Sequence, residues 1–379
     1  MSNTPNVSVA FGNGNLLKNI NNIDGCAAFI GTGKVLGNLN KVFVINSLTN
    51  AIAQGITQVA EPEAYRQISE FYAELGGNQQ IYVLLLANTV TMAEMLDSTN
   101  PSYAIKLIQA GAGTIACLGV FKTPASGYSG GANFMDSDVA SAVTVAASLV
   151  SALNAKQFFF RVIIEGWVII ADESSNTIYA PNTASNGKAG VLLGGSINDG
   201  SASIGALLGR KVAYPCHIKV GKVANGPLQL QNVYIGDKAL ADVTNLDALH
   251  GLGYISFTTY PNKAGFYFGI DNMASADDYS ILVHGAVVDA VAKIAVSVFT
   301  DDLEGEVDSN PDGTIKAAAA QHLEDSITLQ VNATMGDRIS GFSALVDRTV
   351  NIVSTSTTKL KLSVQPLGYN SFIDVEIDL

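Results

Sequence analysis

One stretch of the chain has the spacing of a serine-hydrolase nucleophile motif. Gly127-Tyr128-Ser129-Gly130-Gly131 matches the pattern G-x-S-x-G, in which a sharp turn between a strand and a helix presents the serine for attack on a carbonyl. Here residues 122–126 separate the motif from the preceding apolar run, and no helical pattern begins before Asp136. The stretch therefore indicates a flexible glycine- and serine-rich loop rather than a hydrolase site.

Gly31-Thr32-Gly33-Lys34 resembles part of a phosphate-binding loop, whose backbone N–H groups and lysine hold nucleotide phosphates. A complete loop has a glycine five positions before its second glycine and a Ser or Thr after the lysine, but Ala28 and Val35 occupy those positions. The dinucleotide fingerprint also fails, because the glycines are spaced G-x-G-x-x-x-G. A glycine-rich turn after a strand is the better interpretation.

Residues 308–315 match the first eight positions of a calcium-binding loop, with candidate oxygen ligands on Asp308, Asn310 and Asp312. Position twelve should be a bidentate glutamate but is Ala319. The alternative is a surface turn that leads into a helix. Cys216-His217 has no C-x-x-C or helical histidine companion, so we expect no metal and no cofactor.

The composition favours extensive burial against other protein. The 379 residues are 48% hydrophobic but only 14% charged, against about 25% in an average soluble domain. The longest uncharged helical stretch, residues 139–155, contains five polar side chains and predicts a buried helix rather than a membrane span. The net charge of −12 and the lack of a basic run argue against nucleic acid as a partner. Cys26, Cys117 and Cys216 indicate buried thiols rather than a disulfide frame.

These candidate sites lie in a chain whose first two-thirds alternate between strand and helix patterns. Apolar runs typical of strands buried on both faces are followed by helical stretches with one apolar face. Such alternation predicts an α/β fold with an open sheet flanked by helices. The expected strands are residues 26–30, 41–45, 81–86, 114–121 and 158–164, and the expected helices are residues 61–75, 101–110 and 136–155.

The pattern changes near residue 246. An aromatic hairpin is expected over residues 254–270, two helices over 277–302 and 315–334, and a strand over 341–346. The prediction is thus a smaller α+β C-terminal domain with extended N- and C-terminal β arms. We expect divisions at 1–20 for the N-terminal arm, 21–246 for the α/β domain, 247–354 for the C-terminal domain and 355–379 for the C-terminal arm.

The closing segment has two period-two runs, each with one apolar face. The polar face of the first run is basic and that of the second is acidic, so cross-strand pairs would be favourable. An ordinary hairpin within the chain and a strand donated to another subunit both remain open. The first run comprises Lys359, Leu360, Lys361, Leu362 and Val364, and the second comprises Ile373, Asp374, Val375, Glu376, Ile377 and Leu379.

Short motifs along nearly the whole chain are similar, in order and spacing, to those of contractile tail sheath proteins of phage tails and related injection machines. No single motif is specific, and residues 126–138 and 172–187 lie outside the resemblance. The motifs are Phe29-Ile30-Gly31-Thr32-Gly33, Ala60-Glu61-Pro62-Glu63-Ala64, Phe71-Tyr72-Ala73-Glu74, Ile81-Tyr82-Val83-Leu84, Leu207-Leu208-Gly209-Arg210, Tyr214-Pro215, Gly265-Phe266-Tyr267-Phe268, Asp277-Asp278-Tyr279, Val287-Val288-Asp289-Ala290, Asp312-Gly313-Thr314-Ile315 and residues 369–379.

The resemblance implies a structural subunit without enzyme activity that stacks as sixfold rings into a helical sheath around an inner tail tube. Baseplate and tail terminator proteins would be further partners, in a virion tail or injection particle assembled in the bacterial cytoplasm. Val7, Val9 and Phe11 would form an N-terminal arm, and the two closing runs a C-terminal arm, that join strands of neighbouring subunits. The alternatives are an α/β enzyme, nucleotide-binding or hydrolytic, and a non-contractile phage structural protein.

Overall fold

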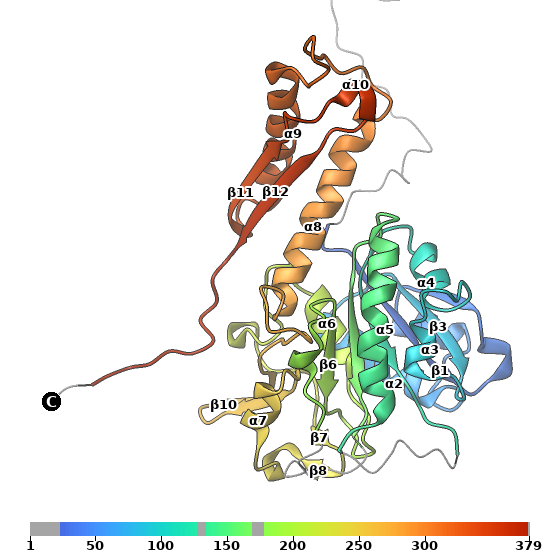
Figure 1. Cartoon of the computed structure of the whole chain (residues 1–379). Coiled ribbons are helices and arrows are strands. Elements are labelled where there is room, and N and C mark those ends of the chain that lie inside the picture. Colours follow the sequence, from blue (N-terminus) through green and yellow to red (C-terminus); the bar gives the residue numbers. More distant parts are fainter. Residues whose placement is uncertain (1–22, 127–133, 169–177, 378–379) are drawn as a thin grey trace, which may run out of the picture.

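A six-stranded sheet organises the larger part of the computed structural model, which describes residues 23–126, 134–168 and 178–377. The strand order is β2-β3-β1-β4-β5-β6, and all neighbours are parallel except β2, which runs antiparallel to β3 (Figure 1). The central strands are continuous apolar runs, as a sheet covered on both faces requires. The strands are β1 (Cys26–Gly33), β2 (Val42–Ile45), β3 (Ile81–Ala87), β4 (Ile115–Phe121), β5 (Arg161–Gly166) and β6 (Ala189–Leu193).

Helices flank this sheet and confirm the predicted α/β class. Helix α2 (Pro62–Leu75) begins with a proline and ends at Gly76, which adopts the left-handed conformation that glycine tolerates best (φ +66°). Helix α6 (Ile204–Val212) lies against α2, and α5 (Ser137–Asn154) contacts β5 and β6. The shorter helices of this region are α1 (Leu48–Ala53), α3 (Met92–Met95), α4 (Ala104–Ala110) and α7 (Leu246–Gly251).

Glycines bring α2 and α6 unusually close. A Cβ atom on Gly205 would lie 1.9 Å from the backbone oxygen of Gln67, and one on Gly209 would lie 2.4 Å from that of Phe71. No side chain fits at either position, so the backbones of the two helices meet directly. This contact fixes how α6 lies on the sheet.

The core of this larger body continues beyond the expected boundary at residue 246. One apolar cluster runs from Cys26 to Leu282 and includes Phe257 and Phe268 of the predicted hairpin. The hairpin therefore belongs to the body rather than to the C-terminal domain. Its strands are β9 (Phe257–Tyr260) and β10 (Lys263–Phe268), and a smaller hairpin comprises β7 (Tyr234–Ile235) and β8 (Lys238–Ala239).

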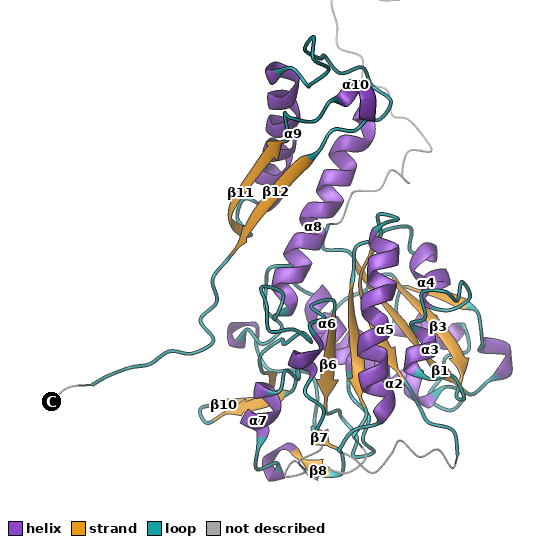
Figure 2. Cartoon of the chain, viewed as in Figure 1, coloured by secondary structure: helices purple, strands orange, loops and turns teal. Residues whose placement is uncertain are grey.

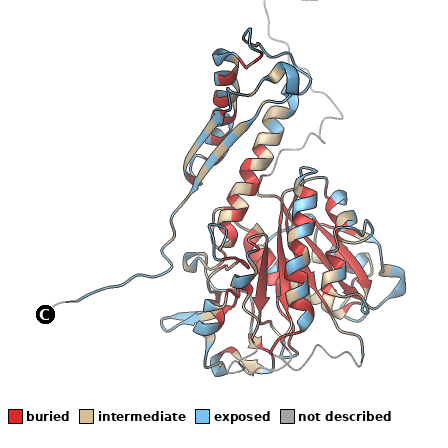
Figure 3. Ribbon diagram, in the orientation of Figure 1, coloured by how far each residue is buried: buried red, intermediate tan, exposed pale blue. Residues whose placement is uncertain are grey.

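The C-terminal module comprises two long helices and a two-stranded antiparallel sheet. Helix α8 (Leu282–Phe299) rises from the body, and α9 (Ala317–Met335) packs beside it (Figure 1). The sheet pairs β11 (Ile339–Val346) with β12 (Leu360–Pro366), and α10 (Ile352–Thr355) lies between them in sequence. A second core, built around Val287, Ile327 and Val331, holds the module together. Helix α8 therefore contributes to both cores: its first turn packs on the body, and the residues after it pack in the module's core (Figure 3).

Two described helices, residues 137–154 and 282–302, are long and apolar enough to cross a membrane by length and composition alone. Core helices of ordinary globular proteins pass the same test. Val139, Val143 and Leu149 of α5 lie in the body's core, and Val287, Val291 and Ile294 of α8 lie in the core of the module. Packing within the chain therefore accounts for their apolar stripes.

Candidate functional site

The β11–β12 sheet has one covered face, one open face and two edges without a partner strand, although the Val346 amide of β11 already donates to Glu324 Oε1 (2.8 Å). Phe342, Leu362 and Val364 turn toward the module's second core, whereas Leu345 and Lys361 are exposed on the other face. Among the described residues no third strand pairs with either β11 or β12. Unpaired edges present backbone N–H and C=O groups in a row, which is the template that an added strand requires.

The structure rules out one of the two pairings left open for the closing segment, the hairpin between its two runs within the chain. Leu360, Leu362 and Val364 lie in β12, and their partner strand is β11, not residues 372–379. Lys359 lies just before β12, so the proposed pairing of Lys359 and Lys361 with Asp374 and Glu376 does not form within the chain. The physical reason is that α8 and α9 supply an apolar surface that β11 and β12 cover together.

The tail after residue 371 is extended and lies away from the body (Figure 2). The described part of the second run forms no strand within the chain, and its pairing with a neighbouring subunit stays a prediction. Its four large apolar side chains are between 75% and 85% exposed, and the acidic side chains between them are also exposed. They are Phe372, Ile373, Val375 and Ile377, interleaved with Asp374 and Glu376; Leu379 lies outside the described residues.

The described chain begins at the junction between body and module. Val7, Val9 and Phe11 lie outside the described residues, but Ile23 packs into the module's core. Asp24 accepts a hydrogen bond from the Cys216 amide (2.8 Å) and pairs with Arg338 (3.0 Å). The root of the N-terminal segment is therefore fixed beside the C-terminal module.

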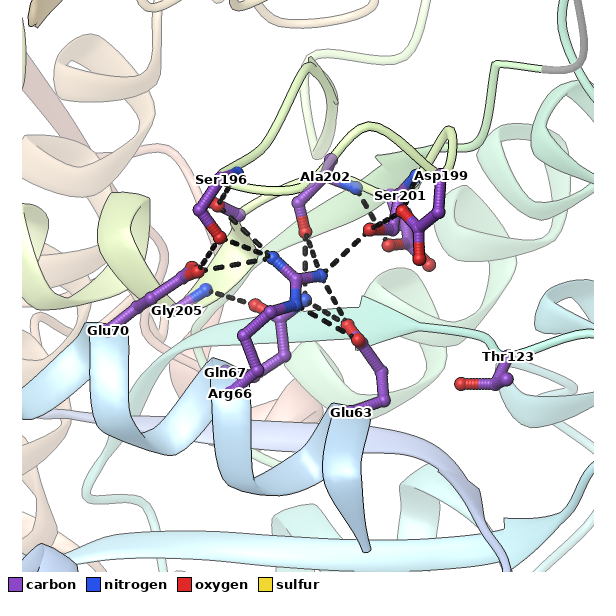
Figure 4. Close-up of polar contacts among 12 residues, drawn as sticks. Glu63, Arg66, Gln67, Glu70, Thr123, Ser196, Asp199, Ser201, Ala202 and Gly205 are labelled. Carbon is purple, nitrogen blue, oxygen red and sulfur yellow. Dashed lines mark hydrogen bonds and ion pairs between the residues drawn. The ribbon is translucent and has the colours of Figure 1, made fainter. Parts of the chain in front are cut away.

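The carboxyl edge of the parallel sheet is where α/β folds commonly bind ligands, and here it holds a buried ionic network. The Arg66 guanidinium pairs with Glu63 (2.5 Å) and Glu70 (3.2 Å) and donates to Ser201 Oγ and the Ala202 carbonyl (Figure 4). Burial lowers the pKa of Arg66, but the two glutamates raise it above its usual value. The guanidinium is thus permanently charged and held by the protein's own groups.

Two more buried carboxylates at this edge accept hydrogen bonds from backbone amides. Glu165 accepts hydrogen bonds from the amides of Lys122 (2.7 Å) and Ala202 (2.9 Å), and burial raises its pKa well above the ordinary value. Glu61 accepts from the amides of Lys34 (2.6 Å) and Val35 (3.0 Å). Glu61 thereby occupies the N–H groups that a phosphate would need in the glycine-rich turn.

An open cavity of about 550 Å³ adjoins the network, lined in part by Lys34, Tyr65 and Trp167. Three of its five charged lining residues, Glu63, Arg66 and Glu70, are paired with one another; the other two are Lys34 and Asp199. The pairing of these three side chains stiffens this edge of the sheet, although Glu70 Oε2 is buried without a hydrogen-bond partner. The motif at residues 127–131 lies outside the described residues.

The calcium-loop candidate does not gather its oxygen atoms. Asp312 Oδ1 accepts from both the amide and the hydroxyl of Thr314, Asn310 donates its amide to the Thr314 hydroxyl, and Asp308 lies 3.5 Å from Lys316. Over the described parts of the chain, no group of three or more His, Cys, Asp or Glu residues could hold a metal ion. The loop has the geometry of a self-capped turn.

The fold is that of contractile tail sheath proteins. The chain superposes on the contracted helical sheath of the anti-feeding prophage with a TM-score of 0.64, 11% identity and coverage of 100% of this chain and 99% of that one. For the contracted sheath complex of an extracellular contractile injection system, PVC, the TM-score is 0.61 at 11% identity, with coverage of 100% of this chain and 98% of that one. For the sheath tail protein of Listeria innocua, the TM-score is 0.54 at 11% identity, with coverage of 91% of this chain and 93% of that one. These likenesses confirm the fold that the motif resemblance predicted.

The chain belongs to the DUF2586 family, whose N-terminal domain model matches residues 4–272. The match spans the N-terminal segment and nearly the whole α/β body, and it ends before helix α8. The search of curated proteins gave no significant match.

Proposed function

We propose that this chain is the polymerising subunit of a contractile tail sheath, stacked in sixfold rings around an inner tail tube. The observation that carries the proposal is the exposed tail on a sheath fold that aligns over the full chain. Water-exposed apolar surface costs about 25 cal/mol per Å², so four such side chains favour a partner surface. Val7, Val9 and Phe11 with residues 372–379 would be the arms that join strands of neighbouring subunits.

The free edges of the β11–β12 sheet are the proposed receptors for those arms. A main-chain hydrogen bond contributes a net ~0.5–1.5 kcal/mol, so one donated strand binds modestly and a lattice of them binds strongly. Contraction would be a rigid-body rearrangement of folded subunits joined by the arms. Baseplate, tail terminator and tube proteins would be partners in the tail particle, which would assemble in the bacterial cytoplasm.

Negative-stain electron microscopy of the purified protein tests this proposal. Full-length protein should form long hollow tubes without an added ligand, and deletion of residues 372–379 should abolish them. The deletion begins at Phe372 because removal of β12 would also uncover the module's core. Ile373→Asp should weaken tubes strongly, whereas Val59→Asp, at a position on the body that is also highly exposed, is the control.

Full-length protein that stays monomeric at high concentration would contradict the proposal. So would a truncated chain that assembles as readily as the intact one. Tubes that keep a single length and diameter under every condition would favour the non-contractile structural protein instead.

A further inference from the structure

A short strap, residues 367–371, connects β12 to the exposed tail and lies against the body. Its central side chain, Tyr369, donates its hydroxyl proton to the backbone carbonyl of His217 at 2.7 Å. The Tyr369 ring lies 6.1 Å from the ring of His284, at the base of α8. One side chain of the strap thus contacts both the body and the helix that carries the C-terminal module.

Lys219 of the body makes two further contacts with the strap. Its Nζ lies 5.6 Å from the centre of the Tyr369 ring, a cation–π distance, and donates to the Ser371 hydroxyl at 3.3 Å. The same Nζ lies 3.2 Å from Asp271, whose carboxylate is fully buried. Because Asp271 holds the ammonium in place, Lys219 presents a fixed charge to the strap rather than a mobile one.

The strap is attached at few points and has open space around it. Two cavities adjoin it, one of about 950 Å³ that His250 and Tyr260 also line, and one of about 550 Å³ that Tyr279 and Val288 also line. Nothing lies within 4 Å of the place where a side chain on Gly368 would begin. Few contacts other than those of Tyr369 therefore hold the strap, so this side chain dominates its attachment.

We infer that Tyr369 is a positioning residue for assembly: it fixes the point on the body from which the C-terminal tail departs. The inference rests on the proposed function, because the tail matters only if a neighbour receives it. With Tyr369 released, the free segment would lengthen by the five residues of the strap. A longer free tether spreads its end over more positions and lowers its effective concentration at a receptor of fixed location.

Limited proteolysis of the full-length protein with subtilisin, at concentrations where it stays unassembled, tests the attachment directly, with mass spectrometry locating each cut. In the wild type residues 367–371 should be cut more slowly than residues 372–377. Tyr369→Ala should raise the rate of cutting in the strap by about tenfold, since local opening sets the rate. Tyr369→Phe, which loses only the hydrogen bond to His217, should raise it less. The matched control is Tyr260→Ala, which removes a ring from the wall of the larger cavity without touching that bond.

Tube formation by the same variants tests the positioning role. Tyr369→Ala should raise the protein concentration needed for assembly several-fold, while its thermal unfolding stays like that of Tyr260→Ala. A wild-type strap that is cut as fast as the tail would overturn the attachment. A released strap in Tyr369→Ala together with wild-type assembly would overturn the positioning role. If the wild type forms no tubes, the proposed function fails, and the proteolysis experiment still decides whether Tyr369 holds the strap.

Discussion

Arg161 and Asp289 form a buried two-point ion pair that fastens the sheet of the body to helix α8. Nε lies 2.7 Å from Oδ2 and Nη2 lies 2.7 Å from Oδ1, with both side chains almost inaccessible to water. Nη2 also donates to the carbonyl of Gly285 on α8, and Nη1 to that of Gly187. The planar guanidinium thus sets both the position and the direction of the helix base.

Removing the carboxylate of this pair should be costly. Asp289→Ala leaves the guanidinium of Arg161 buried without its counter-charge, which should lower the free energy of unfolding by ~3–5 kcal/mol. Urea denaturation followed by circular dichroism measures the loss. Asp308→Ala breaks the exposed pair with Lys316 and should leave stability nearly unchanged. Equal effects of the two substitutions would contradict the structural role of the buried pair.

The contact between α2 and α6 predicts an unusual sensitivity to one methyl group. Gly205→Ala places a Cβ inside the van der Waals radius of the Gln67 carbonyl, so the helices must separate. The cost should be ~1–3 kcal/mol or more, typical of an overpacked core. Differential scanning calorimetry should show a lower melting temperature for Gly205→Ala. Gly77→Ala, where no atom lies within 4 Å, should melt close to the wild type.

The buried carboxylate of Glu61 should be needed for the glycine-rich turn. Glu61→Ala leaves the amides of Lys34 and Val35 and the Asn38 side chain without their acceptor. We expect a loss of ~0.5–1.5 kcal/mol in the free energy of unfolding for each hydrogen bond removed, because the freed groups lie in a part-buried turn. Glu61→Gln keeps one oxygen acceptor and should recover part of this loss in the same denaturation assay. A Glu61→Ala protein as stable as the wild type would show that the turn does not depend on this carboxylate.

Acid should weaken the fold partly through His250. Burial lowers the pKa of His250, and the negative charge of Asp247 offsets only part of this shift. On acidification, His250 is therefore protonated at a higher pH in the unfolded chain than in the folded protein. The stability from a neutral buried His250 is therefore complete above pH ~6.5 and falls below it, by at most ~1.4 kcal/mol per pH unit. His250→Gln should flatten the slope of unfolding free energy between pH 7.5 and 5. His322→Gln, at an exposed position on α9, is the matched control, and an equal slope in both would refute the prediction.

The elements of the body could be predicted because their signals are local. Helix α2 carries its proline, its apolar face and its terminal glycine within a single stretch, and β3 is one uninterrupted apolar run. The alternation around Leu362 likewise identified a strand and its buried face. It could not identify the partner strand, because α8 and α9, which lie earlier in the sequence, supply the surface that β11 and β12 cover together. For the same reason the hairpin that remained open between the two closing runs does not form within the chain, and pairing of the tail with a neighbouring subunit stays a prediction.

The ionic contacts escaped prediction because they join distant parts of the sequence. Arg161 and Asp289 are 128 residues apart, and Glu61 lies 27 residues from the Lys34 amide that it binds. A signal was nevertheless present. Arg161 directly precedes the buried apolar run of its strand, and Asp289 lies within the apolar stripe of a helix. A charge in such a setting requires a buried partner, although the sequence does not say which one.

Helix α8 links the two cores without a break, and this makes it a lever. Its 18 residues extend over about 27 Å, so a tilt of about 10° at the base carries its far end by about 5 Å. The base packs in the body's core beside Arg161, and the shaft carries the β11–β12 sheet. A shift of a fraction of an ångström at the ion pair is thereby magnified at the sheet edges, while both cores stay intact.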